Sequence, residues 1–211
     1  ARSRMPSSRH CARAMMSRAA GKVARRRPAA LTSSRTSRTA DVAETLMDIE
    51  AFLRERGIRA ERHEHAPVMT VEESERLVPR LPGAKTKNLF LRDRKGLRHF
   101  LVTVRHDVAV DLNALGTILG AGRLGFASPD RLQKCLGITP GSVSLLALCN
   151  DAGGAVEFVI DRALWAAPAL QAHPLINTAT LILSHADLER FVAATGHSPQ
   201  IVDVPSASKV A

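Results

Sequence analysis

The chain has 211 residues, and its 30 Lys and Arg against 20 Asp and Glu give a formal net charge of +10. Residues 1–40 hold eleven of the basic residues and no acidic one, whereas residues 41–211 hold 19 basic and all 20 acidic residues. The charge therefore belongs to the N-terminal segment, and it does not make the remainder a general binder of nucleic acid. No apolar run is long enough to cross a membrane, so we expect neither a membrane nor a DNA partner.

Residues 1–40 are rich in Arg, Ser and Ala and poor in large apolar side chains. Such a segment cannot bury enough surface to offset its ordering entropy, so we predict a disordered basic tail. Three interpretations compete: an organellar transit peptide, an arm attracted to RNA phosphates, and inert sequence translated ahead of the natural start, which would do nothing. We favour disorder without function, followed by one domain over residues 41–211.

The three cysteines are odd in number and lack metal-ligand spacing. We interpret them as reduced thiols of a cytoplasmic protein, with Cys135 and Cys149 in core packing. His63, His65, His99 and His106 fall near predicted strand ends, but their spacing matches no zinc signature. No phosphate-binding loop, dinucleotide fingerprint or metalloprotease motif is present, so no metal and no cofactor is expected. Aromatic residues make up only 3 % of the chain, which argues against a face of stacked bases.

The predicted elements alternate along the chain. Four local signals mark helix ends. They are the apolar spacing that stops at Gly57, the capping box at Thr70, and Ser128 and Ser184, which each precede an apolar run. The predicted helices cover residues 41–56, a short stretch from 70 to 79, 111–120, 129–137 and 186–195. The predicted strands cover residues 58–65, 88–92, 97–104, 123–126, 143–149, 156–160, 179–183 and 200–204. Hairpin pairs together with strands between helices predict an α+β domain with a mixed, largely antiparallel sheet.

Two polar residues open the predicted strand that begins at residue 88. Lys87 and Asn88 precede the apolar run from Leu89 onward, which places them at the mouth of a pocket or simply in solvent. A lysine there suits a phosphate or a developing oxyanion. Lys85 lies two residues earlier, on the same side of an extended chain, so two cations can share one phosphate-rich ligand.

His173 lies in a His-Pro turn with Leu175 close behind. Such a histidine is often only a turn residue, yet its apolar neighbours make it the best candidate for a pocket wall. The segment 137–144 holds two glycines and three hydroxyl residues before an apolar run, which lets a substrate approach backbone N–H groups. An ordinary turn is the alternative, and without a nucleophile elbow motif Ser142 and Ser144 are poor nucleophiles.

Several short segments of the chain together resemble the YbaK/ProX family of prolyl-tRNA editing proteins, over about residues 45–205. The segments are Thr86-Lys87-Asn88-Leu89-Phe90-Leu91, Gly122-Arg123-Leu124-Gly125-Phe126, Leu136-Gly137-Ile138-Thr139-Pro140-Gly141-Ser142-Val143, Asn150-Asp151 and His173-Pro174-Leu175. Together they are specific, whereas any one alone is weak.

The resemblance implies roles for particular residues. Lys87 would be the signature functional residue, Asn88 would contact the acceptor end of the tRNA, and His173 would shape a small aminoacyl pocket. The loop from Gly141 to Leu145 would lie over the substrate. The family commonly has a proline where this chain has Leu145, which leaves the amino-acid specificity less determined than the reaction class.

The resemblance thus implies a hydrolase that deacylates mischarged Ala-tRNA(Pro), with that tRNA and prolyl-tRNA synthetase as partners. The tRNA's terminal ribose hydroxyl would assist. Editing of Cys- or Ser-tRNA, or a binding module without activity, are the alternatives.

Overall fold

A computed structural model describes residues 48–67 and 80–207 of the chain. Its strands are β1 (Glu61–Glu64), β2 (Ala84–Arg92), β3 (His99–Arg105), β4 (Gly125–Phe126), β5 (Val156–Asp161), β6 (Ala169–Ala172), β7 (Ala179–Ser184) and β8 (Gln200–Val202). Its helices are α1 (Ile49–Glu55), α3 (Leu112–Ile118), α4 (Pro129–Leu136), the 3-10 helix η1 (Leu145–Asn150), α5 (Arg162–Trp165) and α6 (His185–Ala194). The predicted disordered tail and the helix predicted to open at Thr70 lie outside the described residues.

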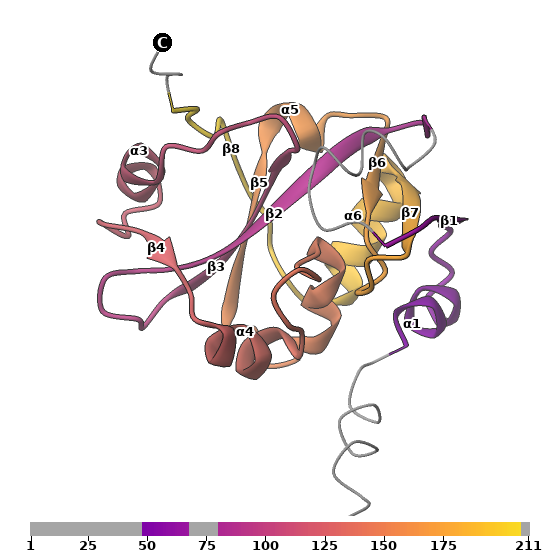
Figure 1. Cartoon of the computed structure of the whole chain (residues 1–211), viewed down its shortest axis with the longest axis horizontal. Coiled ribbons are helices and arrows are strands. Elements are labelled where there is room, and N and C mark those ends of the chain that lie inside the picture. Colours follow the sequence, from indigo (N-terminus) through magenta and orange to yellow (C-terminus); the bar gives the residue numbers. More distant parts are fainter. Residues whose placement is uncertain (1–47, 68–79, 208–211) are drawn as a thin grey trace, which may run out of the picture. The chain divides into compact units, whose positions relative to one another are not determined.

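The eight strands form one mixed sheet in the order β1-β7-β6-β2-β3-β5-β8, with β4 paired to the end of β2. Four of the seven pairings between described strands are antiparallel, while β2 with β6, β3 with β5 and β5 with β8 are parallel. The long strand β2 runs through the middle of the arrangement (Figure 1). The predicted α+β class with a mixed sheet is confirmed.

The central strands bury both of their faces. Phe90 and Leu101 belong to a first hydrophobic cluster, which also takes the apolar sides of α1, α4, η1 and α6. The adjacent residues Leu91 and Val102 belong to a second cluster, which is covered by α3 through Leu115. Since successive side chains of a strand point to opposite faces, these strands are apolar almost continuously.

Side-chain caps set the helix boundaries. Ser128 caps α4 by accepting from the Arg131 N–H, and Gly137 ends that helix in the left-handed conformation at φ 66°, as predicted. Ser184 caps α6 in the same way. Asp48 accepts from two N–H groups of the first turn of α1, so that helix begins at Ile49. The part of this predicted helix before residue 48 lies outside the described residues.

The predicted strand over residues 143–149 is wrong. The structure has η1 there, and Leu145, Leu146 and Leu148 are all buried in the first cluster. A continuous apolar run is compatible with a buried strand or a buried helix, and periodicity does not separate the two. α5 and β6, which are only four residues long each, were not predicted.

A buried polar cluster joins the turn before β5 to the end of α6. Asp151 accepts hydrogen bonds from the N–H groups of Ala155 at 3.0 Å and Val156 at 2.7 Å. Its Oδ2 also lies 3.1 Å from Nε2 of His197, whose side chain is buried and whose Nδ1 lies 3.0 Å from the Thr195 hydroxyl. Every polar atom of the Asp151 carboxylate thus has a protein partner, as a buried charge requires.

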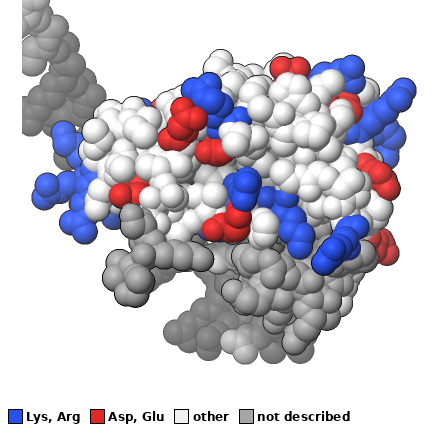
Figure 2. All heavy atoms as spheres, turned by 90° about the horizontal axis from the view of Figure 1, so that it is seen from above, with Lys and Arg blue, Asp and Glu red and all other residues white. Residues whose placement is uncertain are grey.

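On the face drawn in Figure 2, Lys and Arg side chains stand in separate groups with Asp and Glu among them. This mixture agrees with the near balance of charge over residues 41–211. Within the ranges that the structure describes, no helix is both long and apolar enough to span a bilayer.

Candidate active site

The first half of β2 lies between two neighbours of different kinds. Residues Thr86 to Arg92 pair with β3, while Ala84 and Lys85 pair with β6 in parallel, Lys85 opposite Gln171. Because the two strands run in the same direction, Lys87 and His173 each follow this last pair by two residues. Lys87 continues β2, whereas His173 directly follows the last residue of β6, at the place where the two strands separate.

Gln171 fixes the loop that leads into β2. Its side-chain amide donates to the carbonyl oxygens of Leu81, Pro82 and Gly83 at 2.9, 3.2 and 3.1 Å. Gly83 has φ 88°, and a Cβ there would stand 3.1 Å from the Ala169 backbone, so the loop requires glycine. Sequence reasoning missed Gln171, because a single glutamine in an unpredicted four-residue strand gives no signal.

Lys87 differs from its predicted setting at the start of a strand. The strand begins at Ala84, and the half-buried Lys87 ammonium donates to the Val108 carbonyl. Burial lowers the pKa of Lys87 below its ordinary value, and the nearby Asp107 carboxylate opposes that shift. An ammonium held partly out of water acts on a neighbouring anion through a lower effective dielectric than a solvated one.

Asn88 and Lys85 occupy the neighbouring positions of β2. The Asn88 side chain points to the face opposite Lys87, and its Oδ1 accepts from the buried Thr103 hydroxyl at 2.7 Å. This bond fixes the amide orientation and leaves its NH₂ as the donor end. Lys85 lies on the same face as Lys87, as predicted from the strand period.

His173 is largely enclosed. Burial lowers its pKa below the ordinary 6.5, a hydrogen bond with the Ala179 backbone opposes the shift, and the charge of His65 adds to it. Its Nδ1 is buried without a hydrogen-bond partner among the described residues. His65 is itself fixed, with Nε2 3.0 Å from the Thr180 hydroxyl and Nδ1 2.8 Å from the Ala66 carbonyl. The imidazole of His173 is therefore neutral at neutral pH and suited to line a pocket.

The loop from Gly141 to Leu145 divides into an exposed start and a buried end. Gly141 is exposed at φ 93°, and the half-buried Ser142 donates its N–H to the Thr139 carbonyl at 3.1 Å. Ser144 is buried, and its hydroxyl caps η1 by accepting from the Leu146 N–H. Leu145 is fully buried in the first cluster together with residues of β6.

The expected set of residues is therefore only partly brought together. Lys85 and Lys87 share one face of β2, and Asn88 occupies the next position on the other face. His173 directly follows the end of β6, where β2 and β6 separate. Ser144 and Leu145 support the loop from inside, so a direct contact with a ligand falls to Gly141 and Ser142. Among described residues, no hydrogen bond joins this loop to Lys87 or His173.

Other reactive groups do not form a catalytic set. Burial raises the pKa of Cys149 to about 11, which keeps its thiol protonated, and burial also raises the pKa of Cys135. Thiols in such settings are poor nucleophiles. Over residues 48–67 and 80–207, no group of three or more His, Cys, Asp or Glu side chains is arranged to hold a metal ion.

Comparison with known sequences places this site within a family. The sequence profile of the aminoacyl-tRNA editing domain matches residues 65–191, more than half of the chain. The chain belongs to the aminoacyl-tRNA editing domain family. The matched range contains every residue considered for the site.

Two relatives show how far the similarity extends. The prolyl-tRNA editing protein ProX of Acetoanaerobium sticklandii is 42 % identical over 141 residues, which cover 67 % of this chain and 86 % of that protein. The mouse prolyl-tRNA synthetase associated domain-containing protein 1 is 40 % identical over 166 residues, covering 76 % and 97 %. A crystal structure named as a candidate trans-editing enzyme for prolyl tRNA synthetase shares the fold, with a TM-score of 0.56 and 19 % identity over 81 % of this chain and 99 % of that one.

Proposed function

We propose that this protein is a trans-editing deacylase that hydrolyses the aminoacyl ester of mischarged tRNA(Pro), with Ala-tRNA(Pro) as its main substrate. The observation that carries the proposal is the 42 % identity to a prolyl-tRNA editing protein. The aligned family range includes Lys87, Asn88 and His173. The name of the mouse relative supports prolyl-tRNA synthetase as a partner, and we place the reaction in the cytoplasm.

The need for such an enzyme follows from the limits of steric selection. A site that binds proline cannot exclude a smaller side chain by size, and a missing methylene discriminates by only about 1–3 kcal/mol. A second site that admits alanine and rejects proline removes the error after it has been made. The enclosed imidazole of His173 suits one wall of such a small site.

The chemistry requires little beyond positioning and charge. An aminoacyl ester is already activated toward water, so holding it in place and stabilising the developing oxyanion lowers the barrier. The Lys87 ammonium supplies the positive charge. The family resemblance implies that the terminal ribose hydroxyl of the tRNA assists in activating the water.

A panel of charged tRNAs tests the proposal. The full-length protein is mixed with Ala-, Pro-, Cys- and Ser-tRNA substrates, and loss of the aminoacyl ester is followed over time. We expect Ala-tRNA(Pro) to be hydrolysed fastest and Pro-tRNA(Pro) to be spared. Faster hydrolysis of Cys- or Ser-tRNA would identify that tRNA as the main substrate instead. Binding of all four without hydrolysis would establish a binding module without activity.

A further inference from the structure

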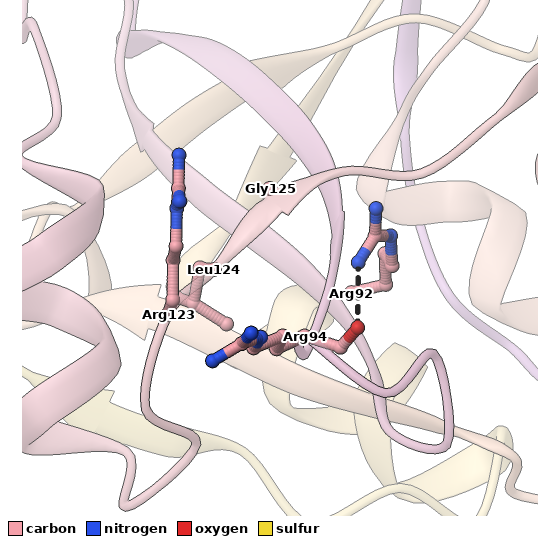
Figure 3. A pocket seen from close by; sticks show the side chains of 5 residues that line it. All are labelled: Arg92, Arg94, Arg123, Leu124 and Gly125. Atoms are coloured by element: carbon pink, nitrogen blue, oxygen red, sulfur yellow. Dashed lines mark hydrogen bonds between the residues drawn. The ribbon is translucent and has the colours of Figure 1, made fainter.

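A group of basic side chains surrounds two adjoining hollows at the far end of β2 from Lys87. The first hollow has a volume of about 440 Å³ and is lined by Arg92, Arg94, Arg123, Leu124 and Gly125 (Figure 3). The second, of about 370 Å³, is lined by Arg92, Arg94, Lys95, Gly96, Phe126, Ser128 and Arg131. Three segments contribute: the end of β2 with its hairpin turn, the β4 strand, and the start of α4. We call this surface the arginine hollow.

The cations of the arginine hollow are not neutralised by the protein. Most other arginines of the described residues form ion pairs with carboxylates, namely Arg56, Arg62, Arg98, Arg105, Arg162 and Arg190. The four arginines of the hollow have no such pair within the same part of the chain. The buried Asp93 carboxylate turns inward to the N–H groups of Leu97 and Arg98, and the exposed Asp130 is the other acid nearby.

Two of these side chains are held in position by the protein. Arg131 donates through Nη1 to the Gly96 carbonyl at 2.9 Å and lies 2.8 Å from Nε2 of His99, whose ring stacks on Phe90. A Cβ on Gly96 would stand 2.7 Å from the Arg131 guanidinium, so glycine makes room for it. Arg92 donates to the carbonyl oxygens of Asp93 and Arg94 at 3.0 and 3.1 Å. These bonds give the hollow a fixed floor.

Phe126 adds an aromatic ring to the same surface. It lines the second hollow and is 63 % exposed, although an isolated phenylalanine gains by burial. Exposed aromatic rings beside arginines are the usual means of binding unpaired bases, because every base offers a face for stacking. Because aromatic residues are scarce, the sequence argues against a face that stacks several bases. One exposed ring that stacks on a single base is compatible with that composition.

We propose that the arginine hollow binds the RNA of the substrate, with phosphates in the two hollows and an unpaired base on Phe126. This inference rests on the proposed function, because it assumes a tRNA substrate. Five residues of extended strand separate Lys87 from Arg92, or about 16 Å at about 3.3 Å per residue. The hollow would thus contact nucleotides away from the ester and supply affinity that the small aminoacyl pocket cannot.

The test compares two double variants of equal charge. Arg94→Gln with Arg123→Gln removes two exposed cations of the hollow, and Arg54→Gln with Arg59→Gln removes two exposed arginines on α1 and before β1. Binding of uncharged tRNA to the full-length proteins is measured by fluorescence anisotropy at several salt concentrations. We expect the first variant to raise Kd about tenfold at low salt and to reduce the salt slope by about 0.7–0.9 per lost phosphate contact. The control variant should stay within about twofold of wild type.

Two further measurements separate the inference from the proposed function. Phe126→Leu should weaken binding at least fivefold, since a stacked base contributes about 1–3 kcal/mol, while leaving the salt slope unchanged. Hydrolysis of a short aminoacyl ester of adenosine should be unaffected by any of these changes. Wild-type affinity and slope in the Arg94→Gln, Arg123→Gln protein would overturn the inference even if the protein deacylates tRNA. Absence of hydrolysis by the wild-type protein would overturn the proposed function itself.

Discussion

The environment of Lys87 distinguishes it from the neighbouring Lys85. Its ammonium is held by the Val108 carbonyl and partly withdrawn from water, whereas Lys85, on the same face of the same strand, has no side-chain partner among the described residues. The two lysines therefore form a natural pair for comparison. They differ in hydrogen bonding but not in charge.

We expect Lys87→Ala to lower kcat/KM for Ala-tRNA(Pro) by about 100-fold or more, the range observed when one donor to an oxyanion is removed. Loss of the bond to Val108 should also cost about 1 kcal/mol of unfolding free energy, which lowers Tm by about 2–4 °C in a domain of this size. Lys85→Ala should have a much milder effect on both. Equal losses of activity in the two variants would indicate a diffuse phosphate-binding patch rather than a site at Lys87.

His173 allows a test of steric selection against acid–base catalysis. If the imidazole excludes proline by its bulk, His173→Ala should raise hydrolysis of Pro-tRNA(Pro) relative to Ala-tRNA(Pro) by about tenfold. Removing a steric clash of about 1.4 kcal/mol corresponds to a tenfold change in relative kcat/KM. A general base would instead slow both substrates by about two to four orders of magnitude. Because its pKa is lowered, His173 stays neutral somewhat below pH 6.5, and a base role would extend activity into that range. No change in ratio or rate would remove His173 from the site.

At the scale of elements, the buried Asp151 joins the turn before β5 to the end of α6. Asp151→Ala would leave the N–H groups of Ala155 and Val156 and the imidazole of His197 without their acceptor. We expect a loss of about 3 kcal/mol and a fall in Tm of about 6–12 °C in thermal unfolding. The control is Asp203→Ala, which removes an exposed ion pair with Arg162 and should cost less than 1 kcal/mol. An unchanged Tm in Asp151→Ala would contradict the structural role given to this cluster.

Elements with distinct local signals were predictable from the sequence. The capped helices α4 and α6 and the strands β5 and β7 were predicted within one or two residues, because Ser128, Ser184 and Gly137 are end signals that act locally. η1 was predicted as a strand because its residues are buried and almost all apolar, and a continuous apolar run does not distinguish a buried helix from a buried strand. β6 and α5 were not predicted because each has only four residues, too few to show the periodicity of a strand or a helix.

The candidate site could be proposed from the sequence as a set of residues, but its geometry could not be predicted. Lys85 and Lys87 share a face because the strand period is local, and this followed from the sequence. The bond from Lys87 to Val108, the support of the loop by Gln171 and the burial of Leu145 depend on segments far apart in the chain. No local pattern encodes such contacts.

At the scale of the whole molecule, residues 1–40 carry the excess positive charge without a large apolar surface. We expect deletion of this segment to leave the Tm of the remaining domain unchanged. Weaker tRNA binding at low salt after deletion would support an accessory basic arm. A fall in Tm of several degrees by calorimetry would contradict the prediction that the segment is dispensable for folding.

The narrow join between β2 and β6 has a consequence for which amino acid the site accepts. Among described strands, only the pairs Ala84 with Leu170 and Lys85 with Gln171 connect the group β1-β7-β6 to the group β3-β5-β8 through β2. The first hydrophobic cluster contains side chains from both groups, among them Phe90, Leu101 and Leu170, so the join is held by the core as well as by these pairs. We therefore expect core packing to set the separation of Lys87 and His173. Discrimination between alanine and proline would then depend on the packing behind the strands as much as on the residues that line the pocket.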